Sequence, residues 1–423
     1  MRVAISRSKA RDHTLLLWVV LFFALALRLI WASLISVEPV SDSFAYQTFA
    51  ENIVNHGVYA WEPDQRSAYW PVGTSAILAG AYMLFGINDN VVVGLNLVAS
   101  VGSIALIHYL GNLYFGRPTG IIAAALLAAW PLMIQYTTII SSELFFIFLT
   151  LLSLACWERT KTAQSQLLWL VAAGVAFASA TYVRPIALLL PIALVLFEVL
   201  RGETGGVRAI LRLVAVMFVM AALIAPWSYR NYTVFGEKVL ISTNFGANFW
   251  MGNNPETTGG YQRLPERVRG LSEVERSAIL EQEAKDFIAD YPILFLQRTL
   301  VKALKLHDRE TIGAHWNQEQ ILKRWGELGF DIARIVPTLY WYAMLALAFM
   351  GMILLARTYG FWLMLLSTPV MFWGYVTAVH AIIVIQDRYH SPSIPFVCML
   401  AASALAVYFK RRRSSHIKSS QGA

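Results

Sequence analysis

The chain has 423 residues, of which 57% are hydrophobic and 14% are charged, and its mean hydropathy is +0.54. Soluble globular proteins carry about 25% charged residues, so this composition excludes an ordinary soluble protein and indicates one that resides in a bilayer. The formal net charge is +8. Because Lys and Arg gather in short loops and at the termini, we interpret that charge as a topology signal. No nucleic acid is expected as a partner.

The first apolar run begins near Leu15, behind Arg2, Arg7, Lys9 and Arg11. It lasts about twenty residues, and no small-residue cleavage site follows it, which favours a retained first helix over a removed signal peptide. Further apolar runs follow along the chain. The predicted spans are 14–36, 89–111, 118–138, 143–158, 166–182, 185–200, 209–227, 335–356, 360–383 and 391–409. The sequence therefore predicts an all-α polytopic membrane protein with about ten transmembrane helices.

One more apolar segment, 70–86, is short, and whether it crosses the membrane decides the topology of everything after it. If the basic N-terminus lies inside and 70–86 does not cross, every inner loop and the tail at 410–413 is basic or mixed-basic. If 70–86 does cross, those loops move outside, against the positive-inside bias. We therefore expect 70–86 to lie in or dip into the outer interface, with both termini cytoplasmic.

This topology divides the chain into four parts. Residues 1–227 form an N-terminal transmembrane module, whose first outer loop covers 37–88. Residues 228–334 form a mixed outer region. Residues 335–410 hold the last three transmembrane helices, and 411–423 form a basic cytoplasmic tail.

Local signals predict one helix in the outer region. Ser272 is followed three residues later by Glu275, which is a capping-box pattern and predicts a helix over 272–290. The preceding run Thr257-Thr258-Gly259-Gly260 is typical of a loop.

Two acidic residues fall at the outer face of the predicted bundle. Asp42 follows the first span, and Glu143 lies in the very short outer loop between the third and fourth spans. Each has a structural explanation, since Asp42 can cap the helix predicted over 43–56 and Glu143 is favoured at a helix N-terminus. As a pair, the carboxylates could deprotonate an acceptor nucleophile or bind a cation.

Three arginines are expected at the same face: Arg184, Arg230 and Arg388. A guanidinium group suits phosphate oxygens and stays charged near a low-dielectric interface. The structural alternative is that each is a snorkelling anchor. Three outer arginines beside two acids indicate an anionic ligand.

Several classes of site are absent from the sequence. It has no Walker A motif, Rossmann fingerprint or nucleophile elbow, which disfavours an ATP-driven pump. An enzyme that uses a cytoplasmic nucleotide sugar is disfavoured because the candidate acids and arginines are predicted on the outer face. His307, His315 and His390 have no ligand spacing, so no metal or other cofactor is predicted, although the two acids leave a divalent cation possible.

At these residues the chain resembles the GT-C superfamily, and more closely the bacterial relatives of dolichyl-phosphate-mannose protein mannosyltransferases and the aminoarabinose transferases. The stretches that carry the resemblance are Asp42-Ser43-Phe44-Ala45-Tyr46, Tyr69-Trp70-Pro71-Val72-Gly73 through Leu84-Phe85-Gly86, Ser142-Glu143, and Ala225-Pro226-Trp227-Ser228-Tyr229-Arg230-Asn231-Tyr232 through Asn248-Phe249-Trp250-Met251-Gly252-Asn253-Asn254-Pro255. Arg388-Tyr389 with Pro392 and Pro395 adds support near the C-terminus.

The resemblance implies a fold and a reaction. It implies a GT-C bundle with interfacial helices in the first outer loop, and transfer of a sugar from a polyprenyl phosphate in the outer leaflet. It implies that Asp42 is the base on the acceptor hydroxyl or amine, that Glu143 orients acceptor or sugar, and that the anomeric centre is inverted. The expected partners are this lipid-linked donor, a glycan, lipid or protein acceptor, and membrane lipids. The expected location is a bacterial inner membrane with a periplasmic or extracellular active site.

The same resemblance suggests which residues hold the donor. In the aminoarabinose transferases a Lys comes just before the Pro of the first loop, whereas Tyr69-Trp70 precede Pro71 here. Arg184, Arg230 and Arg388 are therefore candidates for the missing charge, with Arg388 first. Tyr46, Tyr69 and Tyr389 complete the predicted donor and substrate site.

Two other functions remain open. A flippase or transporter of lipid-linked sugar would also need arginines at the outer face, but it is expected to show inverted repeats and polar groups near the bilayer midplane. A polysaccharide polymerase or ligase also acts outside on lipid-linked glycans. The acids after the first and third spans favour the glycosyltransferase, a hexosyl- or pentosyltransferase.

Overall fold

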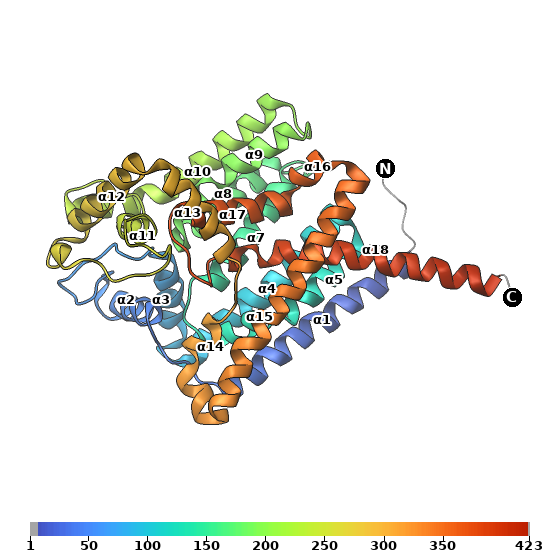
Figure 1. Cartoon of the computed structure of the whole chain (residues 1–423), viewed down its shortest axis with the longest axis horizontal. Coiled ribbons are helices and arrows are strands. Elements are labelled where there is room, and N and C mark those ends of the chain that lie inside the picture. Colours follow the sequence, from blue (N-terminus) through green and yellow to red (C-terminus); the bar gives the residue numbers. More distant parts are fainter. Residues whose placement is uncertain (1–6, 422–423) are drawn as a thin grey trace.

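A computed structural model describes residues 7–421 of the chain and the side chains of residues 14–409. Within these residues the regular secondary structure is helical and there is no strand, apart from one isolated bridge between Ala60 and Arg66. The long helices run side by side, with both termini at one end of the molecule and α2, α3, α11 and α12 gathered at the other (Figure 1). The predicted all-α membrane fold is confirmed.

Each predicted span falls on a helix or on a pair of helices. The helices are α1 (Arg7–Leu34), α4 (Asp89–Phe115), α5 (Arg117–Ala128) with α6 (Pro131–Gln135), α7 (Glu143–Arg159), α8 (Gln166–Val183), α9 (Leu190–Leu200), α10 (Gly206–Phe235), α15 (Gln318–Tyr359), α16 (Phe361–Leu365) with α17 (Thr368–Ile382), and α18 (Ile394–Gln421). Among the described residues, 6 helices are long and apolar enough to cross a membrane, or 7 if the α5–α6 pair, bent by 55°, is one span. The other predicted spans fall on helices that are shorter or interrupted.

Proline explains the two breaks nearest the site. A residue before proline avoids the helical region, and both Trp130 (φ −67°, ψ 114°) and Arg184 (φ −144°, ψ 118°) are extended. Pro131 and Pro185 then begin new helical segments, a position that suits a residue without an N–H. As a result α8 ends at the cavity described below, and Arg184 stands free of the helix at its end.

The first outer loop holds α2 (Asp42–His56) and α3 (Gly73–Phe85). The 13 residues of α3 extend about 20 Å, which is shorter than the hydrocarbon core of about 30 Å. A Cβ on Gly73 would lie 2.5 Å from the carbonyl carbon of Tyr182, so glycine lets α3 pack directly on the end of α8. That α3 lies at the outer interface stays a prediction.

The outer region contains α11 (Phe245–Gly252), α12 (Glu273–Asp290), α13 (Pro292–Lys305) and α14 (Ile312–Trp316). The helix predicted over 272–290 is confirmed as α12, with the Ser272 and Glu275 capping box fully formed. α15 begins at Gln318, so the predicted boundary at 334 lies inside a helix. α18 continues through most of the predicted tail to Gln421; residues 422–423 and residues 1–6 lie outside the described part.

Candidate functional site

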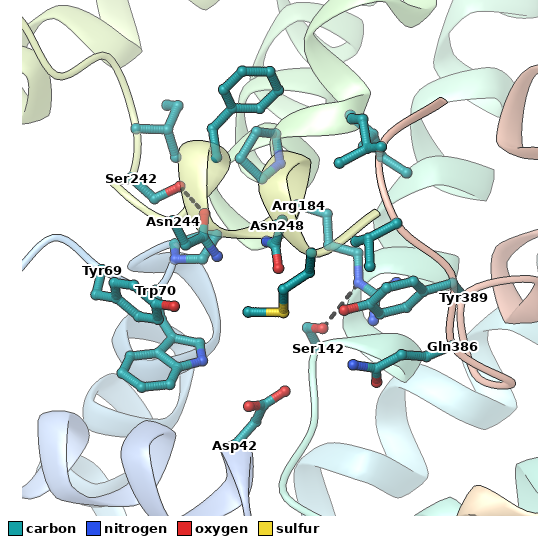
Figure 2. Close-up of a pocket in the computed structure, with 18 of the residues that line it drawn as sticks. Asp42, Tyr69, Trp70, Ser142, Arg184, Ser242, Asn244, Asn248, Gln386 and Tyr389 are labelled. Atoms are coloured by element: carbon teal, nitrogen blue, oxygen red, sulfur yellow. Dashed lines mark hydrogen bonds between the residues drawn. The ribbon is translucent and has the colours of Figure 1, made fainter. Parts of the chain in front are cut away.

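A cavity of about 960 Å³ opens where the first outer loop meets the outer region. Part of its lining is apolar, from the ends of α8 and α17 and from the segment before α11. The apolar lining residues include Val183, Ile186, Leu188, Leu189, Leu240, Ile241, Val379, Ile383 and Val384. Figure 2 shows the polar part, with Asp42 on one wall, Tyr69 and Trp70 on a second, and Arg184 and Tyr389 on a third. The cavity therefore has both an apolar and a charged surface.

Asp42 is the first residue of α2 and lines this cavity. It does not cap the helix, because Ser41 is the N-cap residue and no side-chain cap bond forms there. Its carboxylate instead accepts a hydrogen bond from the guanidinium of Arg388, and its side chain is 25% exposed. Ser41 has φ 54°, the one positive φ outside glycine among the described residues. Such backbone strain is typical of functional sites.

Glu143 is the first residue of α7 and is fully buried. It is not among the residues that line the cavity, although its neighbour Ser142 is. Its carboxylate accepts a hydrogen bond from Arg184 and lies 3.6 Å from Nη1 of Arg388. Glu143 therefore lies behind the two arginines and contacts both guanidinium groups.

Arg184 and Arg388 both line the cavity, and they alternate with the two acids. The order of contacts is Arg184, Glu143, Arg388 and Asp42, so each carboxylate is matched by a guanidinium. Burial lowers the pKa of Arg388, but the charges of Asp42 and Glu143 outweigh that effect and its pKa lies above its ordinary value. The array therefore consists of charged groups whose positive and negative charges nearly cancel.

Neighbouring side chains hold the two guanidinium groups in place. Nε of Arg184 donates to Oγ of Ser142 at 2.9 Å. Nε of Arg388 donates to the side-chain oxygen of Gln386 at 2.9 Å, and its guanidinium lies 4.6 Å from the ring of Trp316. The ring of Tyr389 lies between the arginines, 5.6 Å from one guanidinium and 5.4 Å from the other.

The segment that carries Arg388 has no regular secondary structure and is fixed by the outer region. Asp387 accepts hydrogen bonds from the backbone N–H and the hydroxyl of Thr311, at 3.1 and 2.7 Å. A Cβ on Gly252, at the end of α11, would overlap the carbonyl oxygen of Ile383, so only glycine allows this contact. The outer region thus positions Arg388 opposite Asp42.

His390 fixes the other end of this segment. Its Nδ1 faces the carbonyl oxygen of Leu306 at 2.9 Å and its Nε2 faces Glu310 at 3.1 Å. Burial raises the pKa of Glu310, which also accepts from Trp130. No group of three or more His, Cys, Asp or Glu residues in the described part of the chain is arranged to hold a metal.

Arg230 is not brought to the cavity, contrary to the prediction that it contributes to an anion site. Its guanidinium donates to the carbonyl oxygens of Ser67 and Tyr59 at 2.9 and 3.1 Å, and it lies 4.8 Å from the ring of Trp227. These contacts join α10 to the first outer loop. Tertiary packing directs this side chain to backbone acceptors, and the position of Arg230 in the sequence does not reveal that packing.

The predicted tyrosines all line the cavity. Burial raises the pKa of Tyr46, and the negative charges of Asp42 and Glu143 add to that effect. Burial likewise raises the pKa of Tyr69 to about 12, with Arg276 acting in the opposite direction. Their hydroxyls therefore stay protonated and can donate hydrogen bonds to an anionic ligand.

The sequence reasoning missed Arg276 and Glu273, which lie on α12 and line the cavity. The guanidinium of Arg276 lies 5.4 Å from the ring of Tyr69, and its Nε is buried without a hydrogen-bond partner among the described residues. Glu273 accepts from the backbone N–H of Ala68 at 2.7 Å and from Ser67 at 3.0 Å. Their pattern is that of an ordinary amphipathic surface helix, and no local signal separates them from its other charged residues.

The family described as dolichyl-phosphate-mannose-protein mannosyltransferase matches residues 70–229. That range covers α3 to most of α10 and includes Glu143 and Arg184. A comparison with curated protein sequences finds no match.

Two solved structures share the fold. One is the oligosaccharyltransferase AglB from Archaeoglobus fulgidus in complex with an inhibitory peptide and a dolichol-phosphate, at 15% identity and a TM-score of 0.59, over 99% of this chain and 53% of that one. The other is ArnT from Cupriavidus metallidurans bound to undecaprenyl phosphate, at 16% identity and a TM-score of 0.58, over 92% and 60%. The chain thus spans about half to three fifths of their lengths. The predicted resemblance to the GT-C superfamily, and its membrane fold, are confirmed.

Proposed function

We propose that this protein, which has the GT-C membrane fold, transfers a sugar from a polyprenyl-phosphate donor to an acceptor hydroxyl or amine inside the cavity. The observation that carries the proposal is the carboxylate of Asp42, which is held by Arg388 and opens into a cavity with one apolar and one charged surface. The solved structures of AglB and ArnT, which hold dolichol-phosphate and undecaprenyl phosphate, support this choice of donor.

The reaction is a single displacement. Asp42 accepts the proton of the acceptor hydroxyl or amine as the acceptor atom forms a bond to the anomeric carbon. The bond between that carbon and the phosphate oxygen breaks, and its electron pair leaves with the polyprenyl phosphate. One displacement from the opposite side inverts the anomeric centre. A general base of this kind contributes about 10²–10⁴-fold in rate.

The ion pair with Arg388 suits Asp42 to this role. The hydrogen bond from Arg388 fixes the orientation of the Asp42 carboxylate at the cavity. Arg388 binds one carboxylate oxygen, which leaves the other to face the acceptor. Glu143 acts as a positioning residue, because it is buried behind Arg388 and Arg184 and holds both.

The departing phosphate needs positive charge, and electrostatic stabilisation of developing charge often contributes more to catalysis than any other effect. Arg184 and Arg388 remain candidates, but each is already matched by a carboxylate. Arg276 has a buried donor without a protein partner, and a buried unsatisfied donor costs about 1–3 kcal/mol unless something binds it. We therefore assign the phosphate chiefly to Arg276, assisted by the hydroxyl of Tyr69.

The apolar wall supplies the remaining part of the donor site. Leucine, isoleucine and valine side chains from the ends of α8 and α17 form it, and they suit the first isoprene units of the lipid. Since these helix ends belong to the bundle, the rest of the prenyl chain can stay in lipid. The predicted topology places the cavity on the outer face of a bacterial inner membrane, with both termini cytoplasmic.

A transfer assay tests the proposal. The purified protein is reconstituted in liposomes with radiolabelled polyprenyl-phosphate sugars and an envelope acceptor fraction, and Asp42→Asn is compared with wild type. We expect label to move to an acceptor and the variant to lose at least about a hundredfold in rate while still binding donor. Asp64→Asn, an exposed acid of the same loop, is the matched control and is expected to behave as wild type.

Three outcomes oppose the proposal. If no donor yields transfer but lipid-linked sugar crosses the bilayer equally with either protein, the flippase alternative replaces it. If Asp42→Asn transfers at the wild-type rate, Asp42 is not the base. Extension of a glycan by whole repeat units would instead identify a polymerase or ligase.

A further inference from the structure

α13 is oriented with its apolar side away from the protein. Along its outward face the side chains of Ile293, Leu296, Leu300, Val301 and Leu304 are between 48% and 78% exposed. A surface helix of a soluble protein shows the opposite arrangement, with its apolar stripe facing the core. An exposed contiguous apolar patch of this kind marks a surface that binds something.

The inward side of α13 is polar and cationic. Arg298 donates to the carbonyl oxygens of Asn254 and Pro255 at 2.8 and 3.0 Å. Lys302 is fully buried, and its Nζ donates to the carbonyl oxygen of Gly252 at 3.0 Å and to that of Ile382 at 3.3 Å. These bonds fix the helix in its orientation, so the outward apolar face is not the result of a loosely held segment.

The neighbouring helix α12 has the ordinary arrangement. Its buried residues are Leu280, Ala284 and Phe287. Its exposed side carries charged residues, among them the ion pair between Glu281 and Lys285. Two consecutive helices of the outer region therefore present opposite surfaces, one suited to water and one to hydrocarbon.

The apolar face of α13 continues the apolar surface of the transmembrane bundle. The residues that follow α13 contact α15, where Trp341 donates to the carbonyl oxygen of His307 at 2.9 Å and Tyr342 donates to that of Asp308. Leu339, two residues before Trp341 on α15, and Ile382 on α17, whose carbonyl oxygen accepts from Lys302, are also exposed. Figure 1 shows α13 beside α17, between the bundle and α12.

We propose that α13 lies in the membrane leaflet on the cavity side, with its outward face among the lipid acyl chains. With 14 residues it is about 21 Å long, too short to span a core of about 30 Å, so it lies along the interface. Tyr291 at one end and Lys305 at the other are exposed, and such residues anchor a helix at headgroup level. This assignment does not depend on the reaction.

The placement has a consequence for the cavity. Lys302 joins the last residue of α11 to the last residue of α17, and residues of both helices line the cavity. The part of α13 that faces lipid and the part that holds two cavity walls are therefore one rigid helix. Insertion of α13 sets the height of the cavity opening relative to the lipid surface.

Quenching of a fluorophore tests the proposal. Leu300→Cys and Leu304→Cys are labelled with an environment-sensitive fluorophore in the full-length protein, since the native Cys156 and Cys398 are buried. The vesicles contain phosphatidylethanolamine and phosphatidylglycerol. Ala289→Cys on α12, which is exposed, is the control. We expect nitroxides on the acyl chains to quench the labels on α13 and aqueous iodide to quench the label on α12.

The outcomes are distinct. If iodide quenches the α13 labels as strongly as the α12 label, this face lies in water and the proposal fails. Disulfide formation between two copies of Leu300→Cys would show that a second copy covers the face, which also overturns it. As a measurement on the unaltered chain, a phospholipid with a photoreactive group on its acyl chain should label 293–304 and leave 273–290 unlabelled; the reverse pattern contradicts the proposal.

Discussion

Buried arginine–carboxylate clusters occur at both ends of the bundle, and they differ in what surrounds them. One is the alternating array of Arg184, Glu143, Arg388 and Asp42 beside the cavity. The other centres on Glu198 of α9 and joins the C-terminal end of α7 to α10. That carboxylate accepts from Trp157 at 2.6 Å and from Arg212 at 2.5 Å, and the amine of Lys161 lies 2.7 Å away.

The comparison shows that a buried ion pair alone does not identify a site. In the Glu198 cluster both carboxylate oxygens are bound by protein groups, and Glu198 is 1% exposed. In the cavity cluster Asp42 is partly exposed, and Arg276, which lines the same cavity, has a buried donor without a hydrogen-bond partner. We therefore expect changes in the Glu198 cluster to alter stability, and changes in the cavity cluster to alter turnover.

The largest expected effect is on stability, at Glu198. In Glu198→Gln the cations of Arg212 and Lys161 lose their carboxylate, and breaking a buried pair in this way costs about 3–5 kcal/mol. The folded fraction should transfer sugar at the wild-type rate. Detergent unfolding and activity per folded molecule measure the two effects. If Glu198→Gln were as stable as wild type but transferred sugar slowly, the Glu198 cluster would contribute to turnover and this interpretation would be wrong.

Arg388→Gln should give the largest loss of turnover. The change removes the guanidinium that holds Asp42, the proposed base, and that approaches Glu143, and loss of a positioned general base costs about 10²–10⁴ in rate. Transfer kinetics in vesicles measure it, with Arg309→Gln, an exposed arginine, as the control. Equal losses in both variants would show that net charge, and not this contact, matters.

Arg276→Gln should weaken use of the donor. A hydrogen bond to a charged group contributes about 1.5–3 kcal/mol, so kcat/KM for the donor should fall about 10- to 100-fold. Melting temperature should change little, because Nε of Arg276 makes no hydrogen bond to the protein and the contact of its guanidinium with the ring of Tyr69 is worth only about 0.5–1 kcal/mol. Arg269→Gln, on an exposed arginine, is the control. An unchanged kcat/KM would remove Arg276 from the donor site.

The smallest expected effect is a pH dependence from Lys302. Burial lowers the pKa of Lys302 from 10.5 to about 8. Between these values the unfolded chain binds more protons than the folded protein, so stability rises as pH rises through this window. The melting temperature of wild type should therefore increase from pH 8 upward relative to Lys302→Met. Lys285→Met, on an exposed lysine, should keep the wild-type slope, and parallel curves for all three would contradict the prediction.

The sequence by itself determined the membrane class, the positions of the apolar helices and the α12 cap. These features are local, since a span needs only a continuous apolar run and a capping box needs only residues three apart. The same local signals placed Asp42 and Glu143 at helix starts. The resemblance to GT-C proteins then selected these two acids from the many charged residues of the chain.

Only the tertiary structure decided which charges meet. Asp42 and Arg388 are 346 positions apart, and their contact depends on how the outer region holds the segment after α17. Packing directed Arg230 to backbone carbonyl oxygens and brought Arg276 into the cavity. The local sequence around these two arginines does not distinguish the two outcomes. It also turned the apolar side of α13 outward, because the inward bonds of Arg298 and Lys302 require carbonyl groups that come together only in the folded chain.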